Sequence, residues 1–581
     1  MISYDMPNYM KLPAEGQPRV PSETRVLAPS KGLNELGDDF MIDNKEASDL
    51  MNIMFTDNGV IEKRYGYTTL AEGLSNIPKG LTMFKGSVDS LVCVDGHKVK
   101  KLNSNYQWED ITGSFSVAGN NVTLTSCRQK LFVWDGVGQS NGGCIYYDGS
   151  TMQSGTKCPR GKFSVSYKSR QVCSGVPGQP YRVYFSRTAN PAVFTITSSV
   201  TPQDDEILPN NATEVPGATV FEDPNSSSAA FCIDINKEDG EAVTGLGFFQ
   251  DALIIFKEHS IWQGLFNDAG EFGVSRITNA YGCVAHGSIC TVENDCYFLS
   301  QDGIYVLGNE PNYYTAIRTN QLSARIVGIV DRINYSARDG IRSIYHENKY
   351  IITLPLDDSD VCNYMVTYDK RFYAWSIWSV PASGMAIYLD SSGKQQLAFT
   401  SSVTTNLCRF VPNQYNDNGE PISAYWRSRA FHGLKIDYTK LWKIFRPIFK
   451  GIKGSITISY YDENGEFDAS DDYQINNVSR GGLGTDLVGG VTMGWSVASE
   501  ASASGTGSAS HTEHHSANSN NSKIFNIYIG RESRTFTFQI ENNKIDENFA
   551  LLGFVIQYET KDFNVFDGKM TYLNGNSGLF S

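Results

Sequence analysis

Residues 31–70 read KGLNELGDDFMIDNKEASDLMNIMFTDNGVIEKRYGYTTL, and this stretch decides the fold because the chain after it repeats. Residues 43–52 have a composition compatible with a helix, with apolar side chains spaced to pack inward. Residues 52–55 then change to strand-like side chains. Asp57-Asn58-Gly59 is a turn, because Asn and Gly tolerate positive φ. The stretch therefore predicts a short helix followed by a β-hairpin.

The second strand of this hairpin is expected to span residues 60–67 and to carry Lys63 and Arg64. Two adjacent cations on a strand mark a solvated face or a face that meets a partner. The simplest interpretation is an ordinary hairpin at the start of a domain. Lys63 and Arg64 are nevertheless candidate interaction residues.

Short strand pairs recur from about residue 78 to residue 400. Each unit has an apolar strand, a tight turn containing Asp-Gly or Asn, a second apolar strand and then an aromatic residue, as in residues 90–108. Strand pairs at this spacing indicate four-stranded blades arranged radially, which bury their faces against their neighbours. With roughly 40 to 50 residues per blade, we predict an all-β fold dominated by a β-propeller of six to eight blades.

The chain divides into an extended N-terminal arm, the propeller and a C-terminal domain. Residues 1–30 contain five prolines, which prevent regular helix or central strand. The propeller is expected to span residues 31–410, with a long polar loop inserted at 198–230. Alternating apolar strands then predict an antiparallel, sandwich-like β-domain over residues 411–581. A Gly/Ser/Asn-rich insertion at 480–522 interrupts this domain.

Several short motifs follow one another in a fixed order along the first 400 residues. They are Gly32-Leu33-Asn34, Glu46-Ala47-Ser48-Asp49, Asn52, Asp57-Asn58-Gly59, Lys63-Arg64-Tyr65-Gly66-Tyr67, Leu253-Ile254-Ile255-Phe256-Lys257, Ser260-Ile261-Trp262, Phe298-Leu299-Ser300-Gln301-Asp302-Gly303-Ile304-Tyr305, Tyr368-Asp369 and Trp375. In this order they resemble bacteriophage tail β-propellers, namely the tail nozzle or packaged-DNA stabilisation proteins and related tail hub proteins. The resemblance points to no catalytic residue.

The resemblance implies a structural virion protein of a phage tail, assembled in the bacterial host cytoplasm. Such a nozzle or hub subunit would form a homo-oligomeric ring, expected to be a hexamer, that continues the DNA channel. Its partners would be portal or adaptor (neck) proteins above it, together with tail fibre, spike or plug proteins. Double-stranded DNA would pass through the lumen without sequence recognition, so the ring would retain packaged DNA and pass it during ejection.

Two other functions compete with this one. The first is a carbohydrate-binding or carbohydrate-cleaving propeller that acts as a receptor-binding tail protein. It requires an acidic and aromatic constellation at the centre of the propeller. The second is a bacterial surface interaction propeller, which the absence of a signal-peptide pattern at the N-terminus disfavours.

Charge and hydropathy narrow the choice of partners. The net charge is −14, whereas a protein that grips nucleic acid through its phosphates usually has a basic excess. An acidic chain is still compatible with a DNA conduit, because repulsion prevents sticking. No window approaches about 18 apolar residues, so we expect no membrane span.

The eleven cysteines are scattered along the chain and contain no CxxC pair. No Cys/His cluster has the spacing of a zinc site. We therefore expect buried free thiols, as is usual for proteins that assemble in a reducing cytoplasm.

Basic and aromatic side chains alternate between residues 435 and 453, where the candidate interaction residues are Trp442, Lys443, Arg446 and Lys450. Such a pattern binds single strands or phosphates. It also describes an ordinary amphipathic strand with a solvated charged face.

The insertion at 480–522 has too little apolar surface to offset its ordering entropy, roughly 1 to 2 kcal/mol per residue for the backbone. Its most plausible apolar anchors include Val491 and Trp495. We expect it to pack on an adjacent subunit or to line the channel.

Neither a catalytic nor a metal-binding motif stands out. The acidic residues between 462 and 472 do not have EF-hand spacing and suggest a polar hairpin turn. The histidines between 511 and 515 lie in a Ser/Gly/Asn tract without a scaffold for a metal site. No P-loop occurs. We therefore predict a protein that is not an enzyme and needs no cofactor.

Overall fold

The computed structural model is almost entirely β-strand. It describes residues 21–561 except for 57, 87–88, 114–116, 138–142, 155–158, 189, 195–229, 268–270, 311–312, 434–435, 451–453 and 476–521. None of the helices in these residues is long and apolar enough to cross a membrane.

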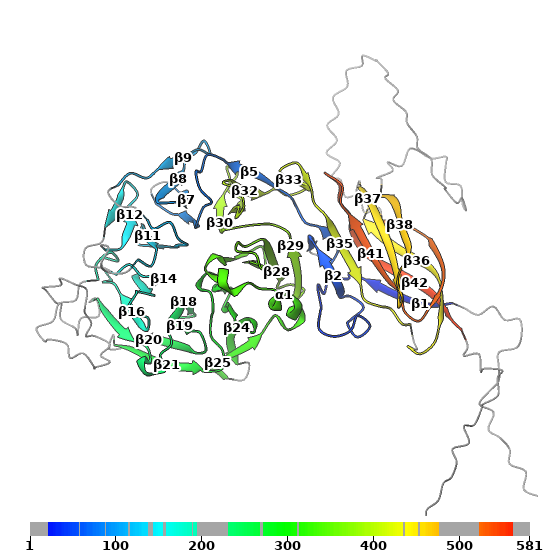
Figure 1. Ribbon diagram of the computed structural model, residues 1–581, viewed down its shortest axis with the longest axis horizontal. Helices are drawn as coiled ribbons and strands as arrows, with labels where there is room; N and C mark the ends of the chain where they lie inside the picture. The colour runs from blue at the N-terminus through cyan, green and yellow to red at the C-terminus, as the bar shows by residue number, and fades with distance from the viewer. Residues whose placement is uncertain are drawn as a thin grey trace, which may run out of the picture.

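Seven sheets of consecutive antiparallel strands form the larger part of the molecule (Figure 1). Blades 1 to 3 consist of β6 (Leu81–Phe84), β7 (Ser90–Asp95), β8 (Lys98–Leu102), β9 (Trp108–Asp110); β10 (Thr123–Cys127), β11 (Lys130–Trp134), β12 (Ile145–Tyr147), β13 (Met152–Ser154); and β14 (Phe163–Tyr167), β15 (Arg170–Ser174), β16 (Arg182–Phe185), β17 (Phe231–Asp234).

Blades 4 to 6 continue in the same way. They consist of β18 (Val243–Phe249), β19 (Ala252–Lys257), β20 (Ile261–Phe266), β21 (Phe272–Thr278); β22 (Cys290–Val292), β23 (Asp295–Ser300), β24 (Gly303–Glu310), β25 (Tyr313–Gln321); and β26 (Ser343–His346), β27 (Lys349–Leu354), β28 (Tyr364–Asp369), β29 (Ala374–Trp378). The short helices between blades are η2 (Lys237–Asp239), η3 (His286–Ser288), η4 (Ala324–Ile326), α1 (Val327–Asp331) and η5 (Tyr335–Gly340).

Blade 7 closes the ring with a strand from the other end of the chain. Its strands are β30 (Gly384–Leu389), β31 (Gln395–Thr400), β32 (Leu407–Phe410) and then β5 (Tyr67–Ala71), with the short β33 (Asn416–Asp417) and β34 (Glu420–Pro421) beyond. The first strands of the seven blades contact one another in order, and β30 contacts β6 again. The structure thus confirms the predicted β-propeller and has seven blades, a number within the predicted range.

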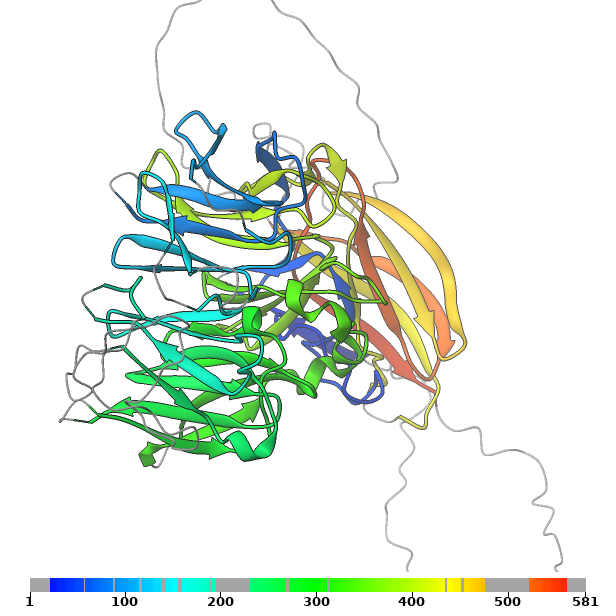
Figure 2. The ribbon, with the colours of Figure 1, turned by 60° about the vertical axis from the view of Figure 1, so that its left-hand side comes forward.

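A β-sandwich lies beside the propeller and contains strands from both ends of the chain. One sheet has β1 (Ser22–Leu27), β3 (Ile53–Phe55), β4 (Ile61–Lys63), β36 (Lys440–Lys450), β39 (Ser522–Ile524), β40 (Ile527–Ser533) and β42 (Ala550–Thr560). The other has β2 (Ala47–Met51), β35 (Ala424–Ser428), β37 (Gly454–Asp462), β38 (Gly465–Ile475) and β41 (Thr537–Asn542). Figure 2 shows the N-terminal strands between the propeller and the rest of the sandwich.

The predicted helix at residues 43–52 is wrong, because β2 occupies residues 47–51. β2 pairs with β35, a strand far along the chain, and buries Ala47 and Leu50 completely. Pairing across the chain therefore overrides the local helix-compatible composition. The predicted hairpin is present, since β3 pairs with β4 around the turn at 56–60.

The domain boundary also differs from the predicted one. β2, β3 and β4 belong to the sandwich sheets, so the propeller begins at β5 rather than at residue 31. Residues 22–27 of the predicted arm form β1, which pairs with β42 along its whole length. These residues form a strand because they hydrogen-bond to β42, and the sequence near β1 does not predict this pairing.

Several expectations fall outside the described residues. These are the first 20 residues of the arm, nearly all of the loop at 198–230 and nearly all of the insertion at 480–522. Among the described cysteines, nine are free thiols as expected, but Cys144 is disulfide-bonded, which corrects the expectation for that residue.

One hydrophobic core runs from the propeller into the sandwich. It includes Leu299 of blade 5, Ile352 of blade 6, Trp375 on the outer strand of blade 6, and Trp426 and Phe538 of the sandwich. The outer edge of blade 6 is hydrogen-bonded to the opening segment, because Leu33 and Asn52 donate their amides to the carbonyls of Trp375 and Ile377. We call this region, where β2 and β3 meet β29 and β4 continues the hairpin into the sandwich, the joint.

Candidate functional site

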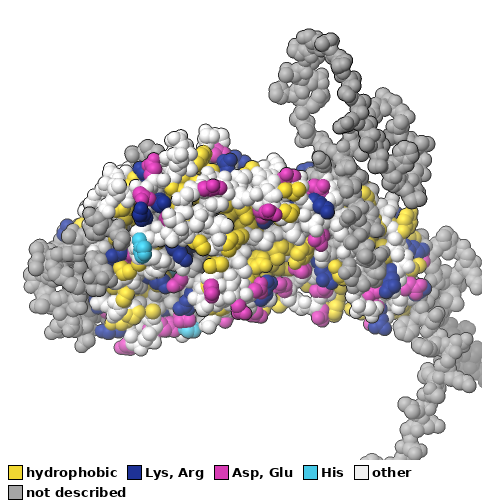
Figure 3. Space-filling model, turned by 45° about the horizontal axis from the view of Figure 1, so that its top comes forward, with side chains coloured by type: hydrophobic (Ala, Val, Ile, Leu, Met, Phe, Trp, Pro, Cys, Tyr) yellow, Lys and Arg dark blue, Asp and Glu magenta, His cyan; other side chains and the backbone are white. Residues whose placement is uncertain are grey.

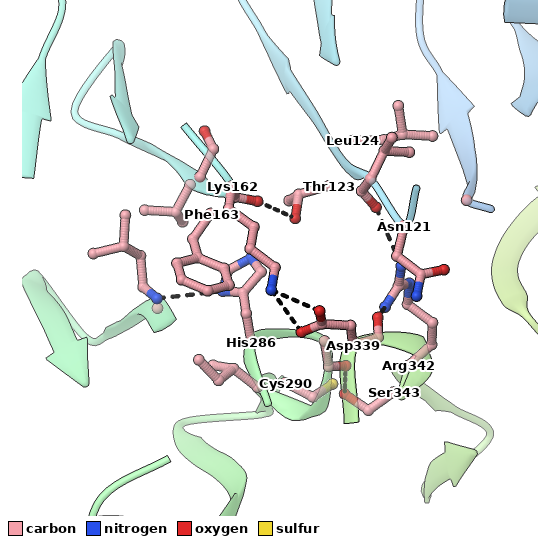
Figure 4. Close-up of a pocket in the computed structure, with 18 of the residues that line it drawn as sticks. Asn121, Thr123, Leu124, Lys162, Phe163, His286, Cys290, Asp339, Arg342 and Ser343 are labelled. Carbon is pink, nitrogen blue, oxygen red and sulfur yellow. Dashed lines mark hydrogen bonds and ion pairs between the residues drawn. The ribbon is translucent and has the colours of Figure 1, made fainter. Parts of the chain in front are cut away.

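A cavity of about 470 Å³ lies on the propeller axis, where the first strands of the blades converge (Figure 4). Its charged and polar lining residues come from several blades and include Asn121, Lys162, His286, Asp339 and Arg342. The cavity is the first place to look for ligand chemistry, since propellers present convergent side chains at the axis.

Three of the four charged lining residues of this axial cavity, Lys162, Asp339 and Arg342, are committed to one another or to the backbone, whereas the partly exposed Arg338 lies 3.8 Å from Glu258. The Lys162 ammonium lies 2.7 Å from both carboxylate oxygens of Asp339. The Arg342 guanidinium donates to the carbonyls of Asp339 and Ile341, at 2.8 Å each, and to those of Val122 at 3.2 Å and Lys79 at 3.4 Å. Arg342 therefore ties the segment before blade 6 to blades 1 and 2.

His286 is a neutral side chain in this setting. Burial, together with the charge of Arg342, lowers the pKa of His286 to about 3. Its Nδ1 accepts a hydrogen bond of 3.3 Å from the Leu246 amide, and its ring packs against Phe163 at 5.3 Å. A ring nitrogen that already accepts a backbone hydrogen bond is poorly placed to take a proton from a substrate.

The lining of the axial cavity contains one carboxylate, that of Asp339, and Lys162 occupies it. Among the described lining residues there is consequently no pair of carboxylates for glycoside cleavage. The arrangement can hold blades together, and its described lining residues place Phe163 and Phe248 beside a single carboxylate.

Asn52 is the centre of the joint and has a positive φ of 56°. Its side-chain amide donates to the hydroxyl of Ser379 at 2.9 Å and to the carbonyl of Ser423 at 2.6 Å. Its side-chain oxygen accepts from Arg64 Nε at 2.8 Å and from the Ser379 amide at 2.9 Å. One buried residue thus connects the opening segment, blade 6 and the start of β35.

Arg64 is 1 % exposed and lies inside the joint. Its guanidinium grips Asp417 with two hydrogen bonds of 2.9 and 2.6 Å. A bidentate pair of this kind is among the stronger hydrogen-bonded contacts. The expectation that Arg64 faces solvent or a partner is therefore corrected: its partner is a carboxylate 353 residues away along the same chain.

Lys63 is 0 % exposed, so it does not face solvent or a partner either. Its ammonium donates to Asn542 Oδ1 at 2.7 Å and to the Lys544 carbonyl at 2.9 Å. Burial, together with the charge of Arg64, lowers the pKa of Lys63 to about 8. Lys63 ties the hairpin to the end of β41 in the second sheet.

The candidate residues on β36 fall into two groups. Trp442 is buried, donates from Nε1 to the Ser533 hydroxyl at 2.9 Å and stacks on Phe536 at 5.4 Å. It is therefore a core residue rather than an interaction residue. The charged side chains lie on the other face of the strand, where Lys443 pairs with Glu559 and Arg446 donates to Asn526 at 2.8 Å.

Lys450, at the end of β36, is exposed. This placement agrees with an amphipathic strand that has a solvated charged face. The other two candidates, Val491 and Trp495, lie outside the described residues. Sequence reasoning missed Asn52, Asp417 and Arg342, because each acts through partners that are distant in the chain.

No known protein family and no curated protein matches the sequence. Among solved structures, a streptogramin B lyase is 9 % identical, with a TM-score of 0.38, and the match covers 60 % of this chain and 97 % of that one. Virginiamycin B lyase from Staphylococcus aureus is 10 % identical, with a TM-score of 0.37, over 60 % of this chain and 99 % of that one. YCF48 bound to D1 peptide is 8 % identical, with a TM-score of 0.33, over 62 % and 99 %. At these values we transfer no residue role from any of them.

Proposed function

We propose that this chain is a structural protein of a phage tail, a nozzle or hub subunit that assembles into a ring around the DNA channel. In this role it retains packaged DNA, passes it during ejection and docks neighbouring tail proteins. The ordered sequence motifs that resemble tail propellers support this proposal, as does the architecture of the subunit.

The observation that carries the proposal is the joint. Lys63 and Arg64 are buried cations with fully formed hydrogen bonds, and a continuous core crosses from blade 6 to the sandwich. A subunit built for load needs its two lobes fixed relative to each other. A joint with buried polar groups resists bending, because any opening leaves those groups without partners.

The axial cavity favours this structural role over a sugar-binding or sugar-cleaving one. Lys162 and Arg342 contact groups within the chain, and its single carboxylate is paired with Lys162. Arg342 ties the centre of the propeller together through the carbonyls of Lys79 and Val122.

Electron microscopy of the purified full-length chain tests the proposal. We expect closed rings of uniform copy number with a central opening wide enough for a DNA duplex. Monomers at every concentration that also release products from glycans would favour the receptor-binding alternative. In that case, the loss of turnover on substituting Asp339 would place the activity in the axial cavity.

A further inference from the structure

A second cavity, of about 490 Å³, lies where blades 6 and 7 meet the hairpin β3–β4. Its volume is within the range of about 300 to 1,000 Å³ that is usual for ligand pockets. Apolar side chains form its floor, including those of Trp378, Leu397 and Phe410. We call it the blade 6/7 pocket.

The floor of this pocket is rigid. Trp378 donates from Nε1 to the Ile53 carbonyl at 2.8 Å, which fixes the indole against the hairpin. The ring of Phe410 lies 5.8 Å from that of Trp378 and 5.1 Å from that of Phe399. A preformed apolar floor loses little entropy when a ligand side chain settles on it.

The rim of the pocket is basic. Lys349, Arg371 and Lys394 line it, with Arg371 already paired with Asp369, and Glu347 is the single carboxylate among its lining residues. Lys394 lies in the turn between β30 and β31 and is exposed. Burial lowers the pKa of His346; the charge of Glu347 opposes this shift, and the charges of Lys349 and Lys394 add to it.

The sequence itself contains a segment of matching chemistry. Residues 201–223 read TPQDDEILPNNATEVPGATVFED, with six carboxylates and no cation. The acidic residues stand next to apolar ones, in Asp204-Asp205-Glu206-Ile207-Leu208 and in Val220-Phe221-Glu222-Asp223. This order suits a pocket whose rim is basic and whose floor is apolar.

We propose that the blade 6/7 pocket binds the acidic segment 201–223 of a second copy of the chain. Its carboxylates would meet Lys394 at the rim, and an apolar side chain would lie on the floor. The inference rests on the proposed ring, because it supplies the contact by which one subunit binds the next.

The positions of the two elements fit such a contact. The segment belongs to the connection between β16 and β17 in blade 3. Blades 4, 5 and 6 separate it from the pocket on one side of the ring, and blades 2, 1 and 7 on the other. Figure 1 places β16 at the end of the propeller far from β29 and β32. A closed ring needs two different surfaces that face away from each other on the same subunit.

The surface around the propeller leaves room for other apolar contacts. Figure 3 shows apolar side chains in a band across the middle of one face, with charged side chains around it. The blade 6/7 pocket differs in charge from the cavity between blades 7 and 1, which has Asp89, Glu109 and Asp390 against the single cation Lys101.

Fluorescence anisotropy with a labelled synthetic peptide of residues 201–223 tests the inference. The receptor is the full chain with its own segment neutralised, so that it does not compete. The substitutions are Asp204→Asn, Asp205→Asn, Glu206→Gln, Glu214→Gln, Glu222→Gln and Asp223→Asn. We expect saturable binding that weakens as the salt concentration rises.

Lys394→Glu in the receptor should weaken peptide binding at least about tenfold, because it places like charges together at the rim. The matched control is Lys85→Glu, which alters an exposed lysine after β6, in the corresponding first turn of blade 1. It should leave the affinity unchanged. A peptide with Ile207, Leu208, Val220 and Phe221 changed to Ser keeps the charge and should bind more weakly, since it loses its anchors.

Equal affinity for the Lys394→Glu and Lys85→Glu receptors, or no binding of the peptide, would overturn the inference. Imaging separates this failure from that of the ring. Rings that persist unchanged in a Lys394→Glu chain would leave the proposed function standing and remove the pocket contact. Peptide binding that depends on Lys394, in a protein that never forms rings, would remove the proposed function instead.

Discussion

Two groups of cationic side chains lie around the same hairpin, β3–β4, and they differ in what surrounds them. In the joint, Lys63 and Arg64 are buried and all their contacts are within the chain. In the blade 6/7 pocket, Lys394 is exposed above an apolar floor. Lys63 and Arg64 are therefore committed to the fold, whereas the ammonium of Lys394 is exposed to solvent.

The difference in burial predicts which substitutions should change the stability of the fold and which should change assembly. Removing one member of a buried ion pair leaves the other charge without a partner in a poorly solvated place. Changing an exposed charge costs little stability, because water solvates either residue. Substitutions in the joint should therefore change the free energy of unfolding, and substitutions in the pocket should change the affinity for a partner.

The largest effect is expected for Arg64→Ala. The substitution leaves Asp417 and the side-chain oxygen of Asn52 without the partner that Arg64 provides. It should lower the free energy of unfolding by about 3 to 5 kcal/mol. Chemical denaturation followed by tryptophan fluorescence measures this change. The free energy of unfolding of Arg64→Lys should fall between those of the wild type and Arg64→Ala, because lysine keeps the charge but cannot form the bidentate contact.

The control is another bidentate pair of the same chemistry. Arg332 binds Asp357 at 2.8 and 2.7 Å, but the two side chains are 42 % and 51 % exposed. Arg332→Ala should cost less than about 1 kcal/mol. If both alanine variants lost the same stability, burial would not be what distinguishes the joint.

The second effect is a pH dependence at Lys63. The pKa of Lys63 is about 8 in the folded chain, below the ordinary lysine value of 10.5. Between these two values the unfolded chain binds the proton and the folded chain does not. Stability from this residue therefore rises with pH across that window, by at most about 1.4 kcal/mol per pH unit.

Lys63→Met isolates this contribution. Denaturation of both proteins at pH 7.5, 8.5 and 9.5 gives the difference in their unfolding free energies at each pH, and other titrating groups cancel in that difference. We expect the unfolding free energy of the wild type to increase relative to that of Lys63→Met as the pH rises. A constant difference would mean that Lys63 titrates alike in the folded and unfolded chains.

The smallest effect on stability is expected for Lys394→Glu. The side chain is exposed, so the free energy of unfolding should change by less than about 0.5 kcal/mol. The same variant should lose ring formation, because a carboxylate at the rim repels the acidic segment. A large loss of stability would place Lys394 with the joint rather than with the pocket.

The blades were predictable because their signals are local. The turn between β7 and β8 contains Asp95-Gly96, where Gly96 has a φ of 59°, and the same dipeptide joins β23 and β24. Apolar strands on either side of such turns pair with their immediate neighbours. The hairpin β3–β4 around Gly59 was predictable for the same reason.

The joint was not predictable, because its contacts join distant parts of the chain. The sequence around Arg64 is typical of a surface cation, because its partner Asp417 is distant in the chain. The local sequence of residues 47–51 likewise does not favour a strand over a helix. The positive φ of Asn52 likewise has no signal in its neighbours. The closing strand β5 and the sandwich strand β1 depend on partners more than 330 residues away.

The central claim is that the joint makes the propeller and the sandwich one rigid unit, and differential scanning calorimetry of the full-length chain tests it most directly. A core shared between blade 6 and the sandwich predicts one cooperative transition, with a single peak that contains the whole unfolding enthalpy. Arg64→Ala should lower the temperature of this peak or split the peak in two. Two separate peaks in the wild-type protein would contradict the account, because the two lobes would then unfold independently.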